Sequence, residues 1–402
     1  MKGTKQRLEL LAARLLIAVQ NVILDSIRIL LFGKTARSAK QARSVLVFRS
    51  SGIGDFICFL PALHLLRKHH PKAKIVLLTT PSANLRWRDK IIPGGMFLAN
   101  HLVDEKLLIP GDKLKDIETV KRIRHSIKLY DPDLCIIFPF SGERFLGRLK
   151  KLIYLRILGL NKNVYGVKME STLSFFRKGQ FAAGKFKHQI TAAISSLKEV
   201  GIQDQEVVFD INITSEDAVI VDSWWKENKF VDHKVVAIHP VSKHKVNQWP
   251  IENFKLLGQM LLESNPNTML IVVGGREEED IADLLVKSWT GAVSFAGKAT
   301  LMQSAEILRR SSLFVGSDSG PMHLATAVKT PVVAIFSSTK FPVFWKPWGE
   351  SSKVIRHSVP CEFCFTKDDF DCPTGTYECI KNITVEEVFN TCLSCLEKKI
   401  TA

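Results

Sequence analysis

Acidic residues are in short supply in this sequence, and its apolar runs are short. It has 40 Asp and Glu residues against 56 Lys and Arg, a formal net charge of +16. Such an excess favours anionic partners such as phosphates, nucleic acid or acidic lipid surfaces, without choosing among them. Apolar residues make up 46% of the 402 positions and charged residues 24%, which argues against a disordered or fibrous chain. At roughly 100–200 residues per domain, the length suggests two domains.

The apolar segment at residues 8–32 lacks a long uninterrupted run. Its longest run covers residues 15–19, whereas a membrane-spanning helix needs about 20 residues. Arg14 and Asp25 interrupt the segment, which also fits poorly with a signal peptide. Polar residues recur every seven positions and would form a narrow stripe beside a broad apolar face: Arg7, Arg14, Asn21 and Arg28.

The same segment is strongly basic. Residues 1–43 hold nine Lys and Arg against two acidic residues. We therefore predict a basic amphipathic helix that lies on an anionic membrane surface. The alternative is a helix that docks on the core of the protein itself.

Two series of alternating strand and helix patterns follow this segment. Residues 45–48 and 75–80 are predicted buried strands, and residues 56–69 between them have helical spacing. This β-α-β order implies a parallel sheet. A second series starts with a strand at residues 234–240, without a detectable sequence repeat. We expect an α/β protein of two Rossmann-like domains facing a cleft, with ligands bound beyond the carboxyl ends of the strands.

The expected domain boundaries follow from these patterns. Residues 1–43 form the N-terminal extension and residues 44–204 the first Rossmann-like domain. Residues 205–385 form the second domain and include a cysteine cluster at 361–379. The C-terminal helix, 386–402, is expected to pack back towards the N-terminal domain.

A polar cluster separates a predicted strand from a predicted helix in the stretch LFVGSDSGPMHL. Its members are Asp318, Ser319, Gly320, Pro321 and His323. Pro321 suits the first helical turn, Asp318 or Ser319 would cap the helix, and Gly320 would allow close approach of the backbone. Free N–H groups of the first turn form an anion site, to which His323 can add a donor. The cluster predicts a phosphate site, although plain helix capping explains the same residues.

A second junction of this kind, SSGIGD, ends in Asp55. If the two domains face each other, Asp55 would face the cleft. A carboxylate there can act as a general base or can cap the helix. From these residues alone, the cap is the better interpretation.

Together these motifs resemble glycosyltransferase family 9, the bacterial lipopolysaccharide heptosyltransferases. The resemblance covers most of residues 44–392, and it is the set in this order that is specific. In order, the motifs are VLVFRSSGIGDFICFLPAL, YDPDLCIIF, NKNVYGVK, AIHPVSKHKVNQWPIENF, IVVGGREEEDIADLL, FAGKATL, GSDSGPMHLATAVKTPVVAIF and CEFCFTKDDFDCPTGTYECIKNITVEEV.

The resemblance implies a GT-B fold and transfer of heptose from ADP-heptose to a lipid-A-linked core acceptor. The anomeric carbon would be inverted, and no cofactor would be required for catalysis. Asp55 matches the family's catalytic carboxylate, which would take the proton of the acceptor hydroxyl. The positions matched to donor binding are Ser242, Lys243, Lys245, Glu277 or its neighbour Glu278 near the ribose, Thr300 near the adenine, and Asp318, Ser319, Gly320 and His323 at the diphosphate.

One position departs from the family pattern. Asn247 stands two positions before Trp249, where the family usually has a lysine that meets the phosphates. Lys243, His244 or Lys245 could supply the missing charge. If none does, the affinity for the donor or its identity differs from the family's. A solvated basic turn is the other interpretation of this loop.

Six of the eight cysteines lie within residues 361–395. Four of them follow the pattern C-x2-C-x7-C-x6-C, and the first pair has metal-ligand spacing: Cys361, Cys364, Cys372 and Cys379. Relatives that glycosylate autotransporter proteins hold iron with cysteines in this region. The interpretations are a structural zinc or iron site, reduced packing cysteines, or disulfides. Cys392 and Cys395 could join the site, whereas Cys58 and Cys135 are expected to be packing residues.

The preferred interpretation is a peripheral enzyme on the cytoplasmic side of a Gram-negative inner membrane. The nearest alternative is the same fold acting with another nucleotide sugar or on a protein acceptor. An alternative of a different class is a non-catalytic nucleotide or nucleic-acid binder with a metal knuckle. The sequence lacks the aromatic-basic stripe of an RNA-binding module, so we expect no nucleic acid partner.

Overall fold

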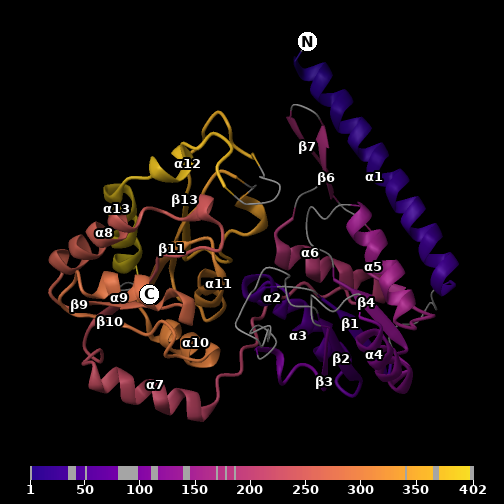
Figure 1. Ribbon diagram of the computed structural model, residues 1–402, viewed down its shortest axis with the longest axis horizontal. Coiled ribbons are helices and arrows are strands. Elements are labelled where there is room, and N and C mark those ends of the chain that lie inside the picture. Colours follow the sequence, from indigo (N-terminus) through magenta and orange to yellow (C-terminus); the bar gives the residue numbers. More distant parts are fainter. Residues whose placement is uncertain are drawn as a thin grey trace. The chain divides into compact units, whose positions relative to one another are not determined.

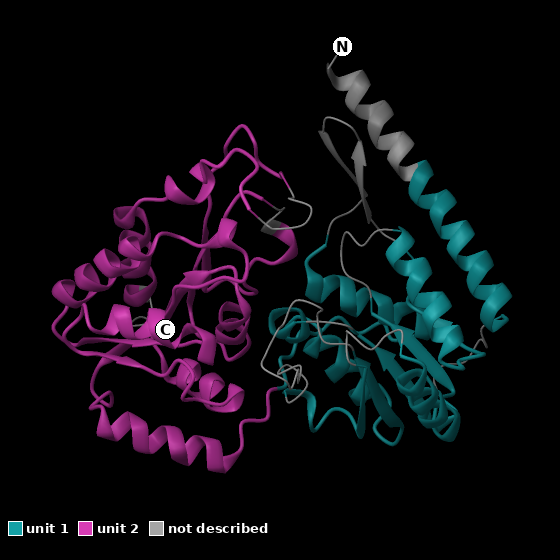
Figure 2. Cartoon of the chain, viewed as in Figure 1, with its two compact units in different colours: residues 1–210 teal, residues 211–402 magenta. Residues whose placement is uncertain are grey.

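The computed structural model describes residues 2–34, 42–49, 52–79, 98–109, 116–138, 145–168, 171–176, 179–184, 187–339, 342–364 and 371–398. The chain divides into two compact units, residues 1–210 and 211–402 (Figure 2). Each unit is built on its own parallel sheet with helices packed on it, which confirms the predicted α/β class (Figure 1).

The first unit has a five-stranded sheet in the order β3-β2-β1-β4-β5, parallel throughout. Its central strands are apolar and buried, as expected for a parallel sheet covered on both faces. The strands are β1 (Ser44–Phe48), β2 (Lys74–Thr79), β3 (Glu105–Leu108), β4 (Leu134–Ile137) and β5 (Val164–Tyr165), with a separate hairpin of β6 (Ser171–Phe176) and β7 (Gly179–Gly184). The helices are α1 (Lys2–Phe32), α2 (Ile53–Ile57), α3 (Leu60–His69), α4 (Ile117–Tyr130), α5 (Phe145–Ile157), α6 (Gln189–Ser196) and the short η3 (Leu197–Val200).

The second unit has a six-stranded parallel sheet in the order β10-β9-β8-β11-β12-β13. The strands are β8 (Lys234–His239), β9 (Thr268–Val272), β10 (Ala292–Ser294), β11 (Leu313–Ser317), β12 (Val332–Ile335) and β13 (Ser352–Ile355). The helices are α7 (Ser215–Glu227), α8 (Ile251–Ser264), α9 (Glu279–Val286), α10 (Leu301–Arg310), α11 (Gly320–Ala327), α12 (Glu378–Lys381) and α13 (Val385–Lys398), with short turns η4 (Lys245–Asn247), η5 (Arg276–Glu278) and η6 (Pro342–Phe344).

The boundary between the units lies after Asp210 and not after residue 204 as predicted. The intervening segment is tied to the first unit by ion pairs. Lys68 of α3 lies 3.1 Å from Asp204 and 3.0 Å from Glu206, and His64 of α3 lies 2.9 Å from Asp210. These side chains hold residues 205–210 on α3, a contact that sequence patterning does not reveal.

The predicted separate extension, residues 1–43, is part of the first unit. Leu24 and Phe32 of α1 are buried in the same apolar cluster as strands β1 and β4. The stretch Leu15–Phe32 is also long and apolar enough to cross a membrane, judged by length and composition alone. The sequence argument against a membrane-spanning helix counted uninterrupted apolar runs. The few polar residues within Leu15–Phe32 are not enough to exclude such a helix by composition.

The C-terminal helix is in a different place from the one predicted. We expected residues 386–402 to pack towards the N-terminal domain, but α13 contributes to the core of the second unit. Val388 and Cys392 are fully buried there, in one cluster with residues of α8 and β11. The apolar stripe of α13 therefore has its partner within its own unit.

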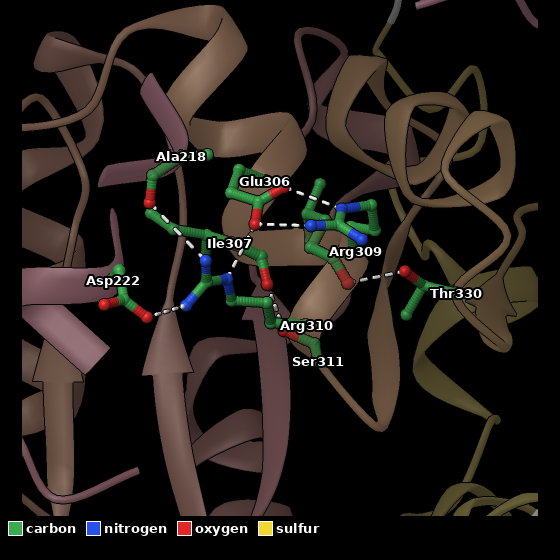
Figure 3. Close-up of polar contacts among 9 residues, drawn as sticks. Ala218, Asp222, Glu306, Ile307, Arg309, Arg310, Ser311 and Thr330 are labelled. Atoms are coloured by element: carbon green, nitrogen blue, oxygen red, sulfur yellow. Dashed lines mark hydrogen bonds and ion pairs between the residues drawn. The ribbon is translucent and has the colours of Figure 1, made fainter. Parts of the chain in front are cut away.

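A buried charge cluster joins α7 to α10 in the second unit (Figure 3). Glu306 is fully buried and accepts hydrogen bonds of 2.7 Å from both Arg309 and Arg310. The guanidinium of Arg310 also donates a hydrogen bond of 3.1 Å to the carboxylate of Asp222 in α7. Burial raises the pKa of Glu306, but the two guanidinium groups outweigh it and hold the pKa below its usual range. The cluster thus fixes α7 on the sheet-covering helix α10.

Candidate functional site

The second unit gathers polar residues at the carboxyl ends of β8 and β11. His239 is the last residue of β8, and Gly316 pairs with it from the neighbouring strand. A Cβ atom added at Gly316 would lie only 2.5 Å from the backbone oxygen of His239. Glycine is therefore needed for β11 to approach β8 at this level. The approach brings the loop after β11 next to the imidazole of His239.

Helix α11 starts directly after this loop, as the sequence predicts. Ser319 is its N-cap residue, in extended conformation, yet among the described residues its side chain forms no capping hydrogen bond. Its hydroxyl lies 3.0 Å from Nδ1 of His239 instead. The positive end of the helix dipole is therefore left without a capping oxygen from Ser319, which favours an anion at this place.

His239 connects Ser319 to an acidic residue, Glu278 of η5, which follows the neighbouring strand β9. Its Nε2 atom is 3.1 Å from Oε2 of Glu278, and the imidazole is buried. Glu278 also accepts a hydrogen bond of 2.7 Å from the backbone N–H of Gly275. Burial is the largest influence on the pKa of Glu278 and raises it, but the hydrogen bond and charge of His239 and the N–H of Gly275 together outweigh burial and lower the pKa overall. Of the two acids predicted near the ribose, Glu278 is in this chain of hydrogen bonds and Glu277 is exposed.

The other residues predicted to bind the sugar donor lie in different parts of the second unit. Ser242 is buried, and its hydroxyl donates to the backbone oxygen of Asp318 at 3.0 Å, so it braces the loop. His323 is buried in the first turns of α11, with its ring centroid 6.0 Å from that of Trp345. Thr300 caps α10, since its hydroxyl accepts the N–H of Gln303 at 3.2 Å. Its hydroxyl is thus engaged in holding the start of a helix.

The basic loop before α8 turns its asparagine inwards. Asn247 is buried and its side-chain oxygen accepts a hydrogen bond of 2.5 Å from Ser337. Lys243 and Lys245 are both exposed, and the ammonium group of Lys245 lies 5.4 Å from the ring centroid of Tyr377. The side chain of Asn247 therefore packs in the interior of the unit, whereas Lys243 and Lys245 are exposed.

Asp55 lies in the first unit, at the third position of α2. Its Oδ2 atom accepts the backbone N–H of Gly52 at 3.2 Å, so the capping role foreseen from the sequence is present. Beneath it, the buried guanidinium of Arg49 donates to the backbone oxygens of Asp55 at 3.4 Å and Phe138 at 3.3 Å. Arg49 thus ties the start of α2 to the end of β4. The carboxylate of Asp55 is half-buried and lies on a rigid support.

Comparison with known proteins agrees with this arrangement. A family model described as glycosyltransferase family 9 (heptosyltransferase) matches residues 161–373, more than half of the chain. The chain belongs to glycosyltransferase family 9. The lipooligosaccharide heptosyltransferase 2 of Campylobacter jejuni is 21% identical over 345 residues, which cover 84% of this chain and 93% of that protein. The family resemblance is thereby confirmed, and the chain is a glycosyltransferase.

Solved structures confirm the two-domain GT-B type of fold for this family 9 chain. The family 9 glycosyltransferase from Veillonella parvula has a TM-score of 0.68 at 17% identity, covering 91% of this chain and 100% of that one. A dodecameric iron-containing heptosyltransferase, TibC, solved with ADP-D-β-D-heptose, has a TM-score of 0.50 at 17% identity, covering 90% and 78%.

The cysteines of this family 9 member are all free thiols, so the disulfide interpretation is wrong. Cys58 and Cys135 are buried packing residues, as predicted. Cys372 accepts a hydrogen bond from the Tyr377 backbone N–H at 3.4 Å, and its sulfur lies 3.2 Å from the Thr374 hydroxyl. Its burial raises its pKa, but hydrogen bonds from Thr374 and following backbone groups lower it overall.

The other cysteines of the cluster lie close enough to influence one another. Burial, followed by the negative charge of Cys361, raises the pKa of Cys364, and Cys379 and Cys372 add to the rise. Nevertheless, the part of the chain that the structure describes contains no group of three or more Cys, His, Asp or Glu placed to hold a metal ion. The geometry as it stands is that of four neighbouring thiols.

Sequence reasoning missed two residues that organise the family 9 site. His239 was read only as the end of a strand, although a polar residue at the carboxyl end of a buried strand is a signal in itself. Arg49 follows β1 directly and precedes the predicted glycine-containing turn, and the sequence assigned it no role. Its burial depends on accepting carbonyls from Phe138, a residue distant in sequence.

Proposed function

We propose that this family 9 enzyme transfers heptose from ADP-heptose to a lipid-A-linked lipopolysaccharide core, with inversion at the anomeric carbon. The observation that carries the proposal is the start of α11, where Ser319 turns from capping towards His239 and leaves an anion site. The lipooligosaccharide activity in the name of the Campylobacter jejuni relative supports the acceptor class. The ADP-D-β-D-heptose bound by TibC supports the donor.

In the proposed mechanism Asp55 is the general base. Its carboxylate takes the proton of the acceptor hydroxyl as that oxygen attacks the anomeric carbon. The bond from the anomeric carbon to the ADP oxygen breaks, and negative charge grows on the leaving diphosphate. The first-turn N–H groups of α11, together with Ser319 and His323, would stabilise that charge. Gly320 keeps the backbone accessible there, and Asp318 shapes the loop through its backbone contact with Ser242.

Positive charge for the diphosphate would come from the exposed lysines. Lys243 is the better candidate, because Lys245 lies against the ring of Tyr377 and Asn247 is buried. Glu277 and Thr300 remain proposed contacts of the ribose and adenine. Exchanging Lys243 for Ala should raise the KM for the donor and leave kcat for saturating donor largely unchanged.

The central test is Asp55→Asn in a transfer assay with ADP-heptose. We expect activity to fall by about 10² or more, while ADP still binds with its original affinity. Asp131→Asn is the control, because Asp131 is an exposed carboxylate of the same unit. Equal activity in Asp55→Asn would remove this residue from the mechanism.

The donor is tested by thermal unfolding with ADP, UDP, GDP and CMP. A ligand at about 100 times its dissociation constant stabilises a protein by roughly 2.7 kcal/mol. We expect a shift with ADP alone, and its loss in His323→Ala. A shift with UDP or GDP would keep the fold and replace the sugar nucleotide, which is the nearest alternative. No shift with any of them would favour the non-catalytic alternative.

A structural metal at Cys361, Cys364, Cys372 and Cys379 is a separate proposal. Four neighbouring thiols are the donor set that a thiophilic ion such as zinc takes, and backbone N–H groups near Cys372 favour its thiolate. The ion would have to draw these thiols closer together than the described residues place them. Elemental analysis of purified protein should find zinc or iron that Cys372→Ser loses and Cys135→Ala keeps. Metal-free protein with full thermal stability would contradict it. We expect transfer itself to continue in chelator, since no cofactor is proposed for catalysis.

The acceptor proposed here is lipid-linked, so we also propose a peripheral position on the cytoplasmic side of a Gram-negative inner membrane. The basic residues 1–43 would attract its anionic surface. A protein acceptor would not need this position. Transfer to purified lipopolysaccharide core and not to protein substrates separates the two.

A further inference from the structure

Helix α1 packs on the first unit with part of its polar stripe facing inwards. Arg28 is buried, and its Nε atom donates to Asp25 at 2.8 Å. Its guanidinium also lies near the carboxylate of Glu199, beyond the helix. Leu24 and Phe32 are buried on the same side of the helix. The side of α1 that meets the protein therefore contains charged groups as well as apolar ones.

The outward side of α1 is the apolar one. Between positions 15 and 30, the described residues with exposed side chains are uncharged except for Asp25, whose carboxylate is 48% exposed and paired with Arg28. The large apolar ones are exposed by 37–84%: Leu15, Val19, Val22, Ile23, Ile29 and Leu30. At 1.5 Å per residue this face is about 22 Å long. A soluble surface helix shows the opposite arrangement, with its apolar stripe on the core.

Helix α5 has an exposed apolar stripe of its own. It packs beside α1 in the first unit (Figure 1). Leu146, Ile153 and Ile157 are exposed by 64%, 45% and 50%. Their spacing of seven and then four residues places them on one side of the helix. The exposed Lys150 lies within that stripe, and the exposed Arg156 is beside it.

We propose that the outward faces of α1 and α5 form one surface that lies in the interface of an anionic lipid bilayer. The apolar side chains would reach the acyl boundary, and Lys150 and Arg156 would meet phosphate headgroups. Apolar area on two neighbouring helices exceeds what isolated exposed residues explain. This inference rests on the proposed function in one respect, because a lipid-linked acceptor would be reached at a membrane.

The same contacts argue against α1 crossing the membrane. Leu24 and Phe32 belong to the core cluster of the first unit, and Arg28 is paired on the protein side. Surrounding α1 with hydrocarbon would remove these contacts and place a charge pair in lipid. The helix therefore lies along the membrane plane, and α5 lies in the same plane.

The test is flotation of the full-length protein with vesicles of phosphatidylcholine and phosphatidylglycerol. Val22→Ser with Leu30→Ser changes the α1 face, and Ile153→Ser with Ile157→Ser changes the α5 face. Each pair should lower vesicle binding by about tenfold or more, since each removes apolar side chains from the interface. Val219→Ser on α7 is the control, because Val219 is equally exposed (65%) in the second unit and should leave binding unchanged.

Three outcomes separate the possibilities. Wild-type binding by the α5 pair would overturn the composite surface. Dimerisation in solution that both pairs of substitutions abolish, with vesicle binding intact, would make this face an interface between copies of the chain and also overturn the proposal.

Heptose transfer to a delipidated soluble acceptor should be unaffected by either pair of substitutions. Failure of that transfer in the wild-type protein would remove the proposed function and leave vesicle binding to stand by itself.

A second, independent observation is the hydrogen-bonded chain Ser319–His239–Glu278 in the other unit, of which His239 is buried. Ser319 Oγ is 3.0 Å from Nδ1 of His239, whose Nε2 is 3.1 Å from Glu278. An ionised Glu278 requires a proton on Nε2. With a neutral ring, Nδ1 must accept, and the Ser319 hydroxyl donates its hydrogen to it. With a protonated ring, Nδ1 donates, and the Ser319 hydrogen is released to point at an anion.

We infer that His239 is a positioning residue that makes Ser319 a donor to the diphosphate only when its own ring is protonated. Binding a nucleoside diphosphate would then take up one proton from solvent, placed on Nδ1. Glu278 from η5 would stabilise the resulting cation. The titratable residues next to these groups in the sequence are Asp318 and His323 around Ser319, Arg276, Glu277 and Glu279 around Glu278, and Lys243 and His244 after β8. This inference also rests on the proposed donor site.

Titration calorimetry of ADP above neutral pH, in buffers of different ionisation enthalpy, tests it. Wild-type protein should take up about one proton per ADP. His239→Asn can donate its amide N–H to Ser319, so it should bind within about threefold of wild type but without proton uptake. Glu278→Gln, which keeps the shape of the chain, should also lose the uptake, and it serves if His239→Asn fails to fold.

Binding without proton uptake in the wild-type protein would overturn the role of His239, as would uptake that persists in His239→Asn. If ADP does not bind but UDP does, the proposed donor fails, and the same measurement with UDP still decides the positioning role.

Discussion

At the scale of single residues, the site depends on where backbones approach each other. Gly316 lets β11 lie against His239, and Ser319 follows three positions later. The sequence predicted the loop and its helix, since Gly, Pro and Asp at a strand end are local signals. It did not predict that Asn247 is buried beside Ser337, because their contact joins segments 90 positions apart.

Gly316→Ala is the residue-scale prediction for stability. Its Cβ would meet a backbone oxygen that has no alternative position within the sheet, so we expect a loss of about 1–3 kcal/mol in the free energy of unfolding. Nucleotide binding should weaken as well, because His239 would be displaced. Urea unfolding measures the first effect.

Gly52→Ala is the matched control for stability. A Cβ there would lie 3.7 Å from Asp55, an ordinary contact, and the backbone of Gly52 suits any residue. A change in stability as large as that of Gly316→Ala would show that the close approach of β11 to β8 is not the cause.

At the scale of elements, local patterns located central strands of both sheets and several helices, but not the edge strands β3, β5, β10 and β13. These patterns did not predict where α13 packs or which side of α1 faces the protein. Both depend on which part of the sheet other helices leave free. Periodicity shows that a helix has two faces, whereas only packing shows which of them is inside. The charge cluster between α7 and α10 was missed for the same reason (Figure 3).

Glu306→Gln is the prediction for that cluster. Removing the carboxylate takes away charge-assisted hydrogen bonds to Arg309, which is 56% exposed, and to Arg310, which keeps Asp222, so we expect a cost of about 1.5–3 kcal/mol. The matched control is Glu252→Gln, an exposed pair with Lys255 on α8, which should cost under about 1 kcal/mol. Urea unfolding at neutral pH measures both. Equal effects in the two variants would contradict a role for burial.

The same carboxylate predicts a pH dependence. The pKa of Glu306 is lower in the folded protein, so its contribution is complete above the ordinary value of 4.5 and is lost as the pH falls through the folded value. Wild-type stability should therefore fall on acidification below about pH 4.5, and less steeply in Glu306→Gln. Parallel curves for the two proteins would assign the acid sensitivity to other carboxylates.

At the scale of the whole molecule, length and the two β-α series predicted two α/β units. The boundary between them could not be predicted, because it is set by side chains that hold an irregular segment. Asp210 ends the first unit, and both its oxygens accept contacts of 2.9 Å, from His64 of α3 and from His101. Burial raises the pKa of Asp210, but these hydrogen bonds outweigh it and lower the pKa overall.

Asp210→Ala should loosen the segment where the chain passes from one unit to the other. Without the carboxylate, His64 and His101 lose this partner, and of the ion pairs described for the segment those of Lys68 with Asp204 and Glu206 remain. We expect cleavage within residues 201–214 to be about tenfold faster in limited proteolysis, with little change in the melting temperature, because local opening there exposes no core. Asp204→Ala is the control, since Lys68 retains Glu206.

In the wild-type protein the protection from cleavage is complete above the ordinary aspartate pKa of 3.8, and it is lost as the pH falls through the lower pKa of Asp210 in the folded protein. Equal cleavage rates in Asp210→Ala and wild type would show that the segment is held by its backbone alone.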